Sequence, residues 1–529
     1  MNFNKKLAVA VSGAVLLMAG QFALADSATD IVDALVSKGV LTEEEGKLIT
    51  KGHTSKTSVT PVVKEKDGAF TLESANGRNS ISLTGRMHLD ARWNDAYEDG
   101  RTDDRDTQSL ADQFELRRAR LGVKGKFAND FKYEVVGNLP GTATIDVAFL
   151  DWAKLDAFQL RMGKFKQPFG LEQLTSSNNI ALMERSYVDQ TVPAKKVGFQ
   201  VMGSPKAGFT YALSTFQPHD TELNVKGGDR ASGAARGTIN FAEIMGNKEM
   251  IMHVGLAGLD QEYTIGTAAT SQTSGTITVA STQRGTISSF RTPGRGLNNV
   301  FRGQVNGEAC NTGAAGSVAT VACASEFSAT VRNKAIGLEG ILASGPFKLV
   351  GEYAAGDYRG TQRAAEVSYD TKTYYVEAGW FITGEKYASS YKNGVFSSFK
   401  PTNDFDIDKG NWGAIEALFR FEGYDVDNAK ISGTLAAPGG RVQGNLNQYT
   451  PVVGTSAAKN NEFAGSGAES GAKTYTGGIR WILNPNVVIK ANYSYTRFDN
   501  AFAPIDVSGA TTGSVKDEKL LTFRTQFMF

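Results

Sequence analysis

Hydrophobic and polar residues alternate with a period of two over most of the chain from residue 80 onward. In the last segment, one face carries Leu521, Phe523, Thr525, Phe527 and Phe529, and the other carries Thr522, Arg524 and Gln526. Successive side chains of a strand point to opposite faces, so the pattern predicts strands with one apolar and one polar face. A half-buried soluble sheet gives the same alternation, and the connections between segments decide between the two.

Sixteen such segments can be recognised. They cover approximately 80–93, 114–127, 131–138, 144–154, 158–165, 196–203, 208–215, 232–242, 249–261, 332–343, 347–356, 370–383, 413–425, 473–483, 487–498 and 517–529. Tight turns follow the second, fourth, sixth, tenth and fourteenth segments, whereas long polar stretches follow the first, fifth, ninth and thirteenth. Short turns at one end and long loops at the other are typical of outer-membrane barrels. We therefore predict an all-β fold, a transmembrane antiparallel β-barrel of about 16 strands within residues 70–529. Residues 385–411 do not fit this alternation of short turns and long loops, because the connection is long where a short turn is expected.

The first 25 residues have the three parts of an export signal. Lys5 and Lys6 supply positive charge, residues 7–19 are apolar, and residues 23–25 form an Ala-Leu-Ala cleavage site. The mature chain should begin at Asp26 and be exported to the outer membrane of a Gram-negative type of cell.

Residues 26–69 have a different pattern. Apolar residues recur at helical spacing, and Thr42 with Glu45 forms a capping box. We predict a short helical segment followed by a polar linker, both on the periplasmic side.

Composition excludes several classes of protein. The 56 basic residues balance 55 acidic ones, which argues against a nucleic-acid-binding protein, whose domain would be clearly basic. Beyond the export signal, no apolar stretch is long enough for a membrane-spanning helix. Cys310 and Cys323 are expected to form a disulfide in an oxidising compartment. The four scattered histidines suggest no metal site, and no cofactor is expected.

The net charge of the chain is close to zero and does not indicate whether a channel would prefer anions or cations. Ion selectivity is therefore predicted from the charged residues on the lumen face of each strand. In the second predicted strand, Leu121, Val123 and Phe127 define the lipid face, and a parity break near Arg117 indicates a bulge. Basic residues on the lipid side would cost about 2–4 kcal/mol each at mid-membrane. The predicted pore-lining residues of the strands are therefore Arg86, Arg92, Arg118, Arg120, Lys124, Lys126, Lys132 and Arg161. The alternative is a general porin whose channel is lined by both signs of charge.

The loop of about 166–195 is too apolar to extend into water. It contains Phe169, Leu171, Leu174, Ile180, Leu182 and Met183. We predict that this loop folds into the barrel and narrows the pore. Lys166 and Arg185 flank its apolar stretch and are the candidate anion-binding residues there. Lys195 and Lys196 can also face the passage. Glu172, Glu184 and Asp189 are expected to compete with the anion or to pair with these four basic residues.

The sequence GKFKQPFGLE, which begins at Gly163, is followed by SS at 176–177 and MERS at 183–186. Together with FELRRARLGVKGKF (114–127) and WFITGEKY (380–387), it resembles the phosphate-selective porin O/P family from about residue 70 to Phe529. The resemblance implies a sixteen-stranded barrel, usually trimeric, whose third loop folds inward. It also implies that phosphate or related anions diffuse past arginine and lysine side chains.

Two further classes of function stay open at this point. An outer-membrane enzyme would need a nucleophile and its base, and the chain has no G-x-S-x-G, H-E-x-x-H or P-loop motif. An adhesin would bind through residues 262–331 and 426–472, which lack large aromatic anchors. The favoured interpretation is a porin that contacts outer-membrane lipids and small anions such as phosphate.

Overall fold

The structure is a computed structural model that describes residues 32, 34–49, 60–66, 69–99, 113–218, 231–265, 271–273, 276–278, 284–297, 300–306, 329–362, 365–432, 446–447, 468–502 and 514–529. The predicted export signal and the predicted pair Cys310 and Cys323 lie outside these residues. The chain forms two compact units, one of residues 1–65, 70–82 and 126–129, and one of residues 66–69, 83–125 and 130–529.

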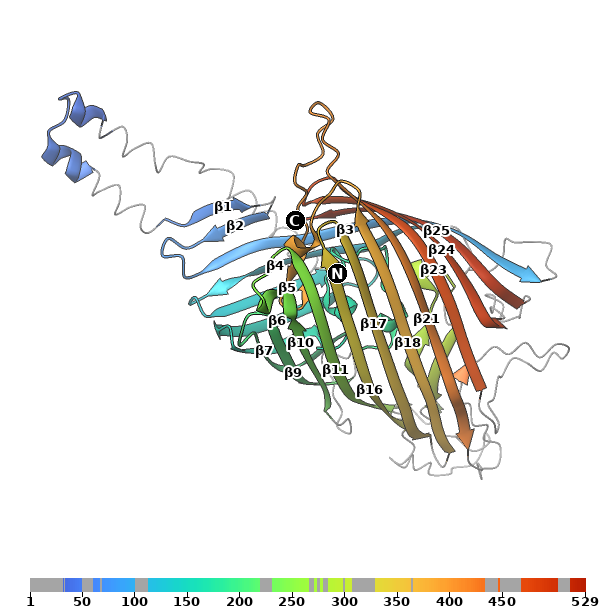
Figure 1. Cartoon of the computed structure of the whole chain (residues 1–529). Coiled ribbons are helices and arrows are strands. Elements are labelled where there is room, and N and C mark those ends of the chain that lie inside the picture. The colour runs from blue at the N-terminus through green and yellow to red at the C-terminus, as the bar shows by residue number, and fades with distance from the viewer. Residues whose placement is uncertain are drawn as a thin grey trace. The chain divides into compact units, whose positions relative to one another are not determined.

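Sixteen of the described strands form a closed antiparallel barrel (Figure 1). They are β3 (Ser80–Asp99), β4 (Gln113–Phe127), β5 (Phe131–Asn138), β6 (Thr144–Leu155), β7 (Phe158–Lys166), β8 (Lys195–Gly203), β9 (Phe209–Phe216), β10 (Ser232–Asn240), β11 (Met250–Ile265), β16 (Ala329–Ser344), β17 (Phe347–Gln362), β18 (Ala365–Phe381), β21 (Ala414–Ser432), β23 (Ala468–Ile482), β24 (Val487–Phe502) and β25 (Ser514–Met528). The pairing of β25 with β3 closes the barrel, with a register that runs from Ser514↔Asp99 to Met528↔Arg86. All sixteen predicted strands are confirmed.

The remaining described elements are short. The strands are β1 (Val62–Lys66), β2 (Ala69–Glu73), β12 (Ser271–Thr273), β13 (Thr276–Thr278), β14 (Arg284–Phe290), β15 (Phe301–Asn306), β19 (Tyr391–Lys392), β20 (Val395–Phe396) and β22 (Leu446–Asn447). The helices are α4 (Leu171–Leu174), α5 (Phe241–Ile244), η1 (Tyr187–Gln190), η2 (Pro293–Arg295) and η3 (Tyr387–Ser390). None of the helices in the described ranges has the length and apolar character needed to cross a bilayer.

The predicted capping box near the N-terminus is present. The Thr42 amide donates to the Glu45 carboxylate at 2.9 Å, and the Glu45 amide donates to the Thr42 hydroxyl at 3.3 Å. The prediction of a continuous polar linker is wrong at residues 62–66, which form β1. There Lys64 forms an ion pair with Glu73 at 2.9 Å. Val62 and Val63 supply the β-branched residues that favour a strand.

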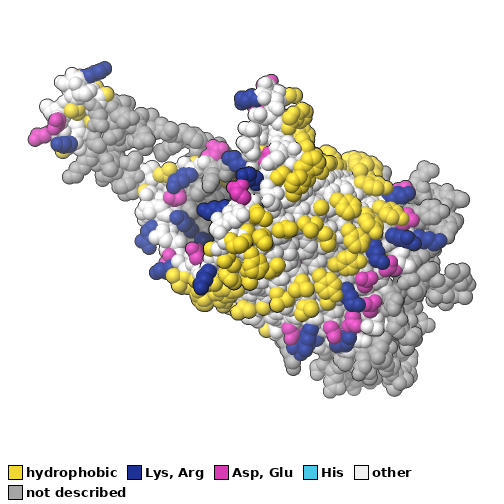
Figure 2. All heavy atoms as spheres, in the orientation of Figure 1, with side chains coloured by type: hydrophobic (Ala, Val, Ile, Leu, Met, Phe, Trp, Pro, Cys, Tyr) yellow, Lys and Arg dark blue, Asp and Glu magenta, His cyan; other side chains and the backbone are white. Residues whose placement is uncertain are grey.

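Apolar side chains face outward around the barrel wall. On β16, Ile336, Leu338 and Leu342 are 57%, 51% and 54% exposed, whereas Asn333 and Glu339, at inward positions, are buried. A soluble protein would not present leucines on every second position of a long strand. Figure 2 shows that these side chains form a broad hydrophobic surface, as a lipid-facing barrel requires.

Two inward segments fill much of the barrel. The predicted inward loop, residues 167–194, packs Phe169, Leu171 and Val188 into the interior. The second is the segment 385–399, which the alternation pattern left unexplained. Its Phe399 stacks on Phe381 with ring centroids 4.6 Å apart, and its Tyr387 is buried. These aromatic residues explain why the connection is long, because it turns back into the barrel from the short-turn end.

The barrel wall has unequal height. Strands β5, β7, β8 and β9 have 8 or 9 residues, whereas β16 and β17 have 16 and β21 has 19. At a rise of about 3.3 Å per residue, the low part of the wall is roughly half as tall as the high part. The inward loop connects β7 and β8, so it enters the barrel from the low side.

Candidate functional site

A large chamber of about 1830 Å³ lies inside the barrel, next to the low wall and the inward loop. Its basic lining residues are Arg86, Arg118, Arg120, Lys132, Arg161, Lys164, Lys166, Arg185, Lys195, Lys206, Arg236 and Lys392. Its acidic lining residues are Glu134, Asp146, Asp151, Asp156 and Asp189. Twelve basic against five acidic side chains of the lining leave a formal excess of seven positive charges, although two of the basic residues, Arg118 and Arg236, also pair with Glu184 and Glu339 outside the lining. A water-filled space with this excess attracts anions and repels cations.

The backbone of the inward loop is fastened to the wall opposite the chamber. Lys490 on β24 donates to the carbonyl oxygens of Ile180 and Leu182, at 2.7 and 3.2 Å. Glu352 on β17 accepts the amides of Leu171 and Glu172, both at 2.7 Å. These contacts satisfy buried polar groups of the loop and fix its position. The other side of the loop is left to face the chamber.

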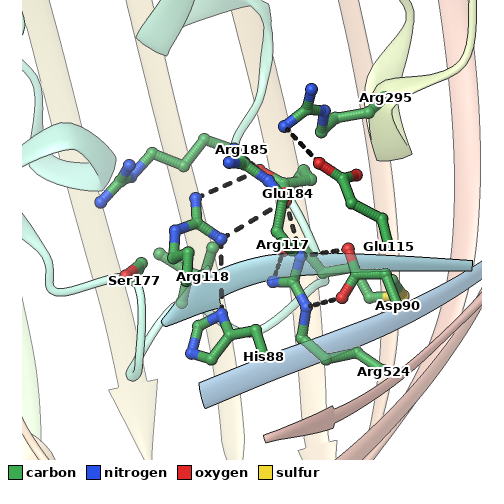
Figure 3. A network of polar contacts seen from close by, with 12 residues as sticks. His88, Asp90, Glu115, Arg117, Arg118, Ser177, Glu184, Arg185, Arg295 and Arg524 are labelled. Atoms are coloured by element: carbon green, nitrogen blue, oxygen red, sulfur yellow. Dashed lines mark hydrogen bonds and ion pairs between the residues drawn. The ribbon is translucent and has the colours of Figure 1, made fainter. Parts of the chain in front are cut away.

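A buried ion network holds the loop through Glu184 (Figure 3). The Glu184 carboxylate accepts from Arg117 at 2.8 Å, Arg118 at 3.4 Å and Arg524 at 2.6 Å. Arg524 also binds Asp90 through both carboxylate oxygens, at 2.6 and 2.7 Å. The consecutive residues Arg117 and Arg118 both point inward, in agreement with the bulge predicted at this place.

The second carboxylate of the loop is also bound to the wall. Glu172 forms an ion pair with Arg420 on β21 at 2.6 Å and accepts the Ser186 amide at 2.7 Å. Arg420 is 2% exposed and also pairs with Glu377 at 2.6 Å. Glu172 and Glu184 therefore do not pair with the side chains of Lys166 and Arg185, because arginines of the strands hold both carboxylates.

Three basic side chains converge where the loop borders the chamber. Arg86 on β3 donates to the Ser177 hydroxyl at 2.9 Å. Lys166 and Arg185 both donate to the Thr175 carbonyl, each at 2.9 Å. Among the described residues, Arg86 and Lys166 have no carboxylate within ion-pair distance, while Arg185 lies 3.6 Å from Asp189. The cluster therefore places basic groups that have no carboxylate partner in the described part of the chain at the border of the chamber.

Comparison with known proteins agrees with this geometry. The family model described as "Phosphate-selective porin O and P" matches residues 81–290 and 321–529. The chain belongs to this porin family. Porin O of Pseudomonas aeruginosa is 24% identical to the porin over 453 residues, which cover 83% of this chain and 87% of that protein.

Solved structures with a similar fold include OmpT of Vibrio cholerae and the anion-selective porin from Comamonas acidovorans. OmpT is 9% identical with a TM-score of 0.45, and the match covers 85% of this chain and 98% of OmpT. The Comamonas porin is 10% identical with a TM-score of 0.43, and the match covers 85% and 100% of the two chains. The protein is an outer-membrane channel of the porin type.

Seven of the ten predicted basic residues line the porin's chamber, namely Arg86, Arg118, Arg120, Lys132, Arg161, Lys166 and Arg185. The prediction is wrong for Arg92, which is 4% exposed and held by Asp90 at 2.7 Å and Glu115 at 2.6 Å. Lys124 and Lys126 are also absent from the described lining, since they lie at the short-turn end of β4.

Lys195, which the sequence placed beside the passage, lines the chamber as well. Four basic lining residues were missed from sequence, namely Lys164, Lys206, Arg236 and Lys392. Arg236 has the inward parity of β10, so the alternation rule would have found it had it been applied to every strand. Lys392 belongs to β19 in the second inward segment, and no periodic signal marks it. The porin shows no cluster of three or more potential metal ligands within the described residues.

Glu184→Gln should loosen the inward loop. Burial alone would raise the pKa of Glu184, but the charges of Arg118, Arg524 and Arg117 outweigh burial and hold this pKa well below its usual range. Removing the charge takes the carboxylate partner from Arg117 and Arg118, while Arg524 keeps Asp90, and breaking such a buried pair from one side costs about 3 kcal/mol. We expect a lower unfolding temperature and noisier single-channel currents. Glu184→Asp is the matched control and should retain part of the stability.

The same pKa predicts how the loop responds to acid. Because the folded-state pKa of Glu184 is depressed, the ion network stabilises the protein fully above the ordinary Glu pKa of about 4.3 and loses its effect as the pH falls below it. Single-channel noise of the unmodified porin should stay constant between pH 7 and about pH 5. Noise that increases within this range in the unmodified porin but not in Glu184→Gln would mean that Glu184 is not bound as described.

Proposed function

We propose that the porin prefers phosphate and related oxyanions, and that Arg86, Lys166 and Arg185 form the main anion-binding station. The supporting observation is that the loop carboxylates Glu172 and Glu184 are bound to wall arginines, which leaves this cluster available. Guanidinium and ammonium groups replace the hydration of an oxyanion by charge-assisted hydrogen bonds. The hydroxyls of Ser176 and Ser177 lie within 3.4 and 2.9 Å of Arg86 and add neutral donors.

The other basic residues of the chamber would act as weaker anion-binding sites along the permeation pathway. Arg120 and Lys195 share Asp146, and Arg161 is paired with Asp151 at 2.7 Å. A carboxylate next to a cation lowers its affinity for a passing anion, and several weak sites in series allow rapid exit. A charge pair at about 4 Å and an effective dielectric of 20 contributes about 4 kcal/mol before desolvation. The paired residues would therefore conduct the anion without trapping it.

We further propose that the porin assembles as a homotrimer through its low wall. The outward residues Leu160 and Phe199 of β7 and β8 are 43% and 61% exposed. Strands of 8 or 9 residues are at the lower limit for crossing a bilayer, which favours burial against other copies.

The alternative function is a general porin without phosphate preference. The five acidic residues that line the chamber favour this alternative.

Phosphate block of chloride current tests the anion preference. Phosphate should reduce the chloride conductance of the porin in a saturable way. Arg86→Ala should weaken this block about tenfold, which corresponds to about 1.4 kcal/mol. Arg86→Lys should retain most of the block, and Lys409→Ala, on an exposed turn away from the chamber, should leave it unchanged. An absence of saturable block in the unmodified porin would contradict the proposal and favour the general porin.

A further inference from the structure

A groove of about 910 Å³ lies on the lipid-facing side of the barrel. It is near the long-loop ends of the adjacent strands β9, β10, β11, β16, β17 and β18. Its floor is a row of outward positions across adjacent strands, in the order Leu213, Ala235, Gly258, Ile336 and Ala355. Leu213 and Ile336 are large, whereas the positions between and beside them are small. The small residues leave the backbone uncovered, and the surface is hollowed there.

The apolar belt ends at this row, and a row of mostly charged residues follows it towards the long loops. Two residues further along each strand, the register aligns Gly233, Asp260, Lys334, Asp357 and Asp370. Figure 2 shows basic and acidic side chains together along this margin of the hydrophobic surface. The groove therefore runs from the hydrocarbon region to the level at which lipid headgroups lie.

Most charges of this margin are paired with one another. Arg332 binds Asp260 through both carboxylate oxygens. Arg359 binds Asp357 at 3.1 Å and Asp370 at 2.7 Å. Lys334 differs, because no carboxylate of the described residues lies within ion-pair distance of its ammonium group. An exposed ammonium beside an apolar groove is suited to a phosphate carried by a lipid.

We propose that this groove binds one acyl chain of a phosphorylated glycolipid of the outer leaflet, with the phosphate on Lys334. Continuity with the lipid-facing belt favours an acyl chain as the occupant of the groove. The mixture of aspartates with Lys334, Arg332 and Arg359 fits a headgroup that carries both phosphate and sugar hydroxyls, since carboxylates accept hydrogen bonds from hydroxyls. The long loops extend from this end of the barrel, which places the groove in the outer leaflet.

Gly258→Leu tests the acyl-chain part of the proposal. A Cβ at Gly258 would meet no heavy atom within 4 Å, so the leucine can fill the groove without a clash. Gly477→Leu is the matched control, because Gly477 also faces outward on a strand, lies outside the groove and has open space around its Cβ. The probe is diphosphorylated lipid A, added to the detergent-solubilised porin and measured by native mass spectrometry.

The unmodified porin and Gly477→Leu should retain lipid A equally, whereas Gly258→Leu should bind it about tenfold more weakly. Lys334→Glu should weaken binding of lipid A but leave binding of a monoglucosyl diacylglycerol, which carries no phosphate, unchanged. Normal conductance of each variant shows that it is folded. Equal retention by Gly258→Leu and Gly477→Leu would overturn the groove as the binding site. Equal affinity of the unmodified porin for the two lipids would overturn the phosphorylated glycolipid as its ligand.

Discussion

Replacing Arg86, Lys132 and Lys392 together by Glu should remove most of the anion preference of the channel. These residues line the chamber from three different elements, β3, β5 and the second inward segment. Three reversals change the charge of the chamber by six, so the formal excess of seven positive charges falls to one. We expect the anion-to-cation permeability ratio to fall by roughly tenfold, because each charge acts across a partly screened, water-filled space. The measurement is the reversal potential under a potassium chloride gradient.

A control with the same change in net charge distinguishes the chamber from the surface. Lys372, Lys386 and Lys409 are exposed and lie outside the chamber lining. Their joint replacement by Glu should leave the reversal potential unchanged within a few millivolts, since salt screens charges at the exposed surface. An equal shift in both triple variants would show that net charge, and not the chamber, determines selectivity.

Arg524→Met should cause the largest loss of stability among single substitutions at this site. The Arg524 side chain is fully buried and pairs with Asp90 and with Glu184 of the inward loop, each at 2.6 Å. Methionine is similar in length but leaves two carboxylates in the interior without their shared partner. Breaking a buried ion pair from one side costs about 3–5 kcal/mol. The unfolding temperature of the barrel, followed by heat modifiability on gels, should fall clearly.

The double variant Arg524→Met, Asp90→Asn provides the matched comparison. Removing the Asp90 charge relieves part of the uncompensated burial, so the double variant should be more stable than Arg524→Met alone. If Arg524→Met unfolds at the temperature of the unmodified porin, the network around Glu184 does not stabilise the folded state.

The strands could be predicted from sequence because a bilayer requires strict alternation. Ile336 and Leu338 on β16 follow this rule without exception, and so do Phe523 and Phe527 on β25. The long-loop ends were predicted too short, as for β21, which continues to Ser432 instead of ending near residue 425. Beyond the bilayer both faces are polar, so the apolar signal disappears while the strand pairing continues.

The interior was harder to predict, because ion pairs follow three-dimensional proximity. The basic residues of β3 and β4 could be assigned to the lumen by parity, but parity does not reveal their partners. Arg92 faces inward and is neutralised by Asp90 and Glu115, whereas Arg86 faces inward without a carboxylate among the described residues. The second inward segment has no periodic pattern at all, and Lys392 could not be placed in the chamber without the fold.

The most direct test of the account is the reversal potential of the unmodified porin in a planar bilayer under a tenfold gradient of potassium chloride, a salt whose two ions have nearly equal mobility. The chamber's formal excess of seven positive charges predicts a potential of the sign that chloride preference gives. A potential near zero, or one of the sign that potassium preference gives, would contradict the account.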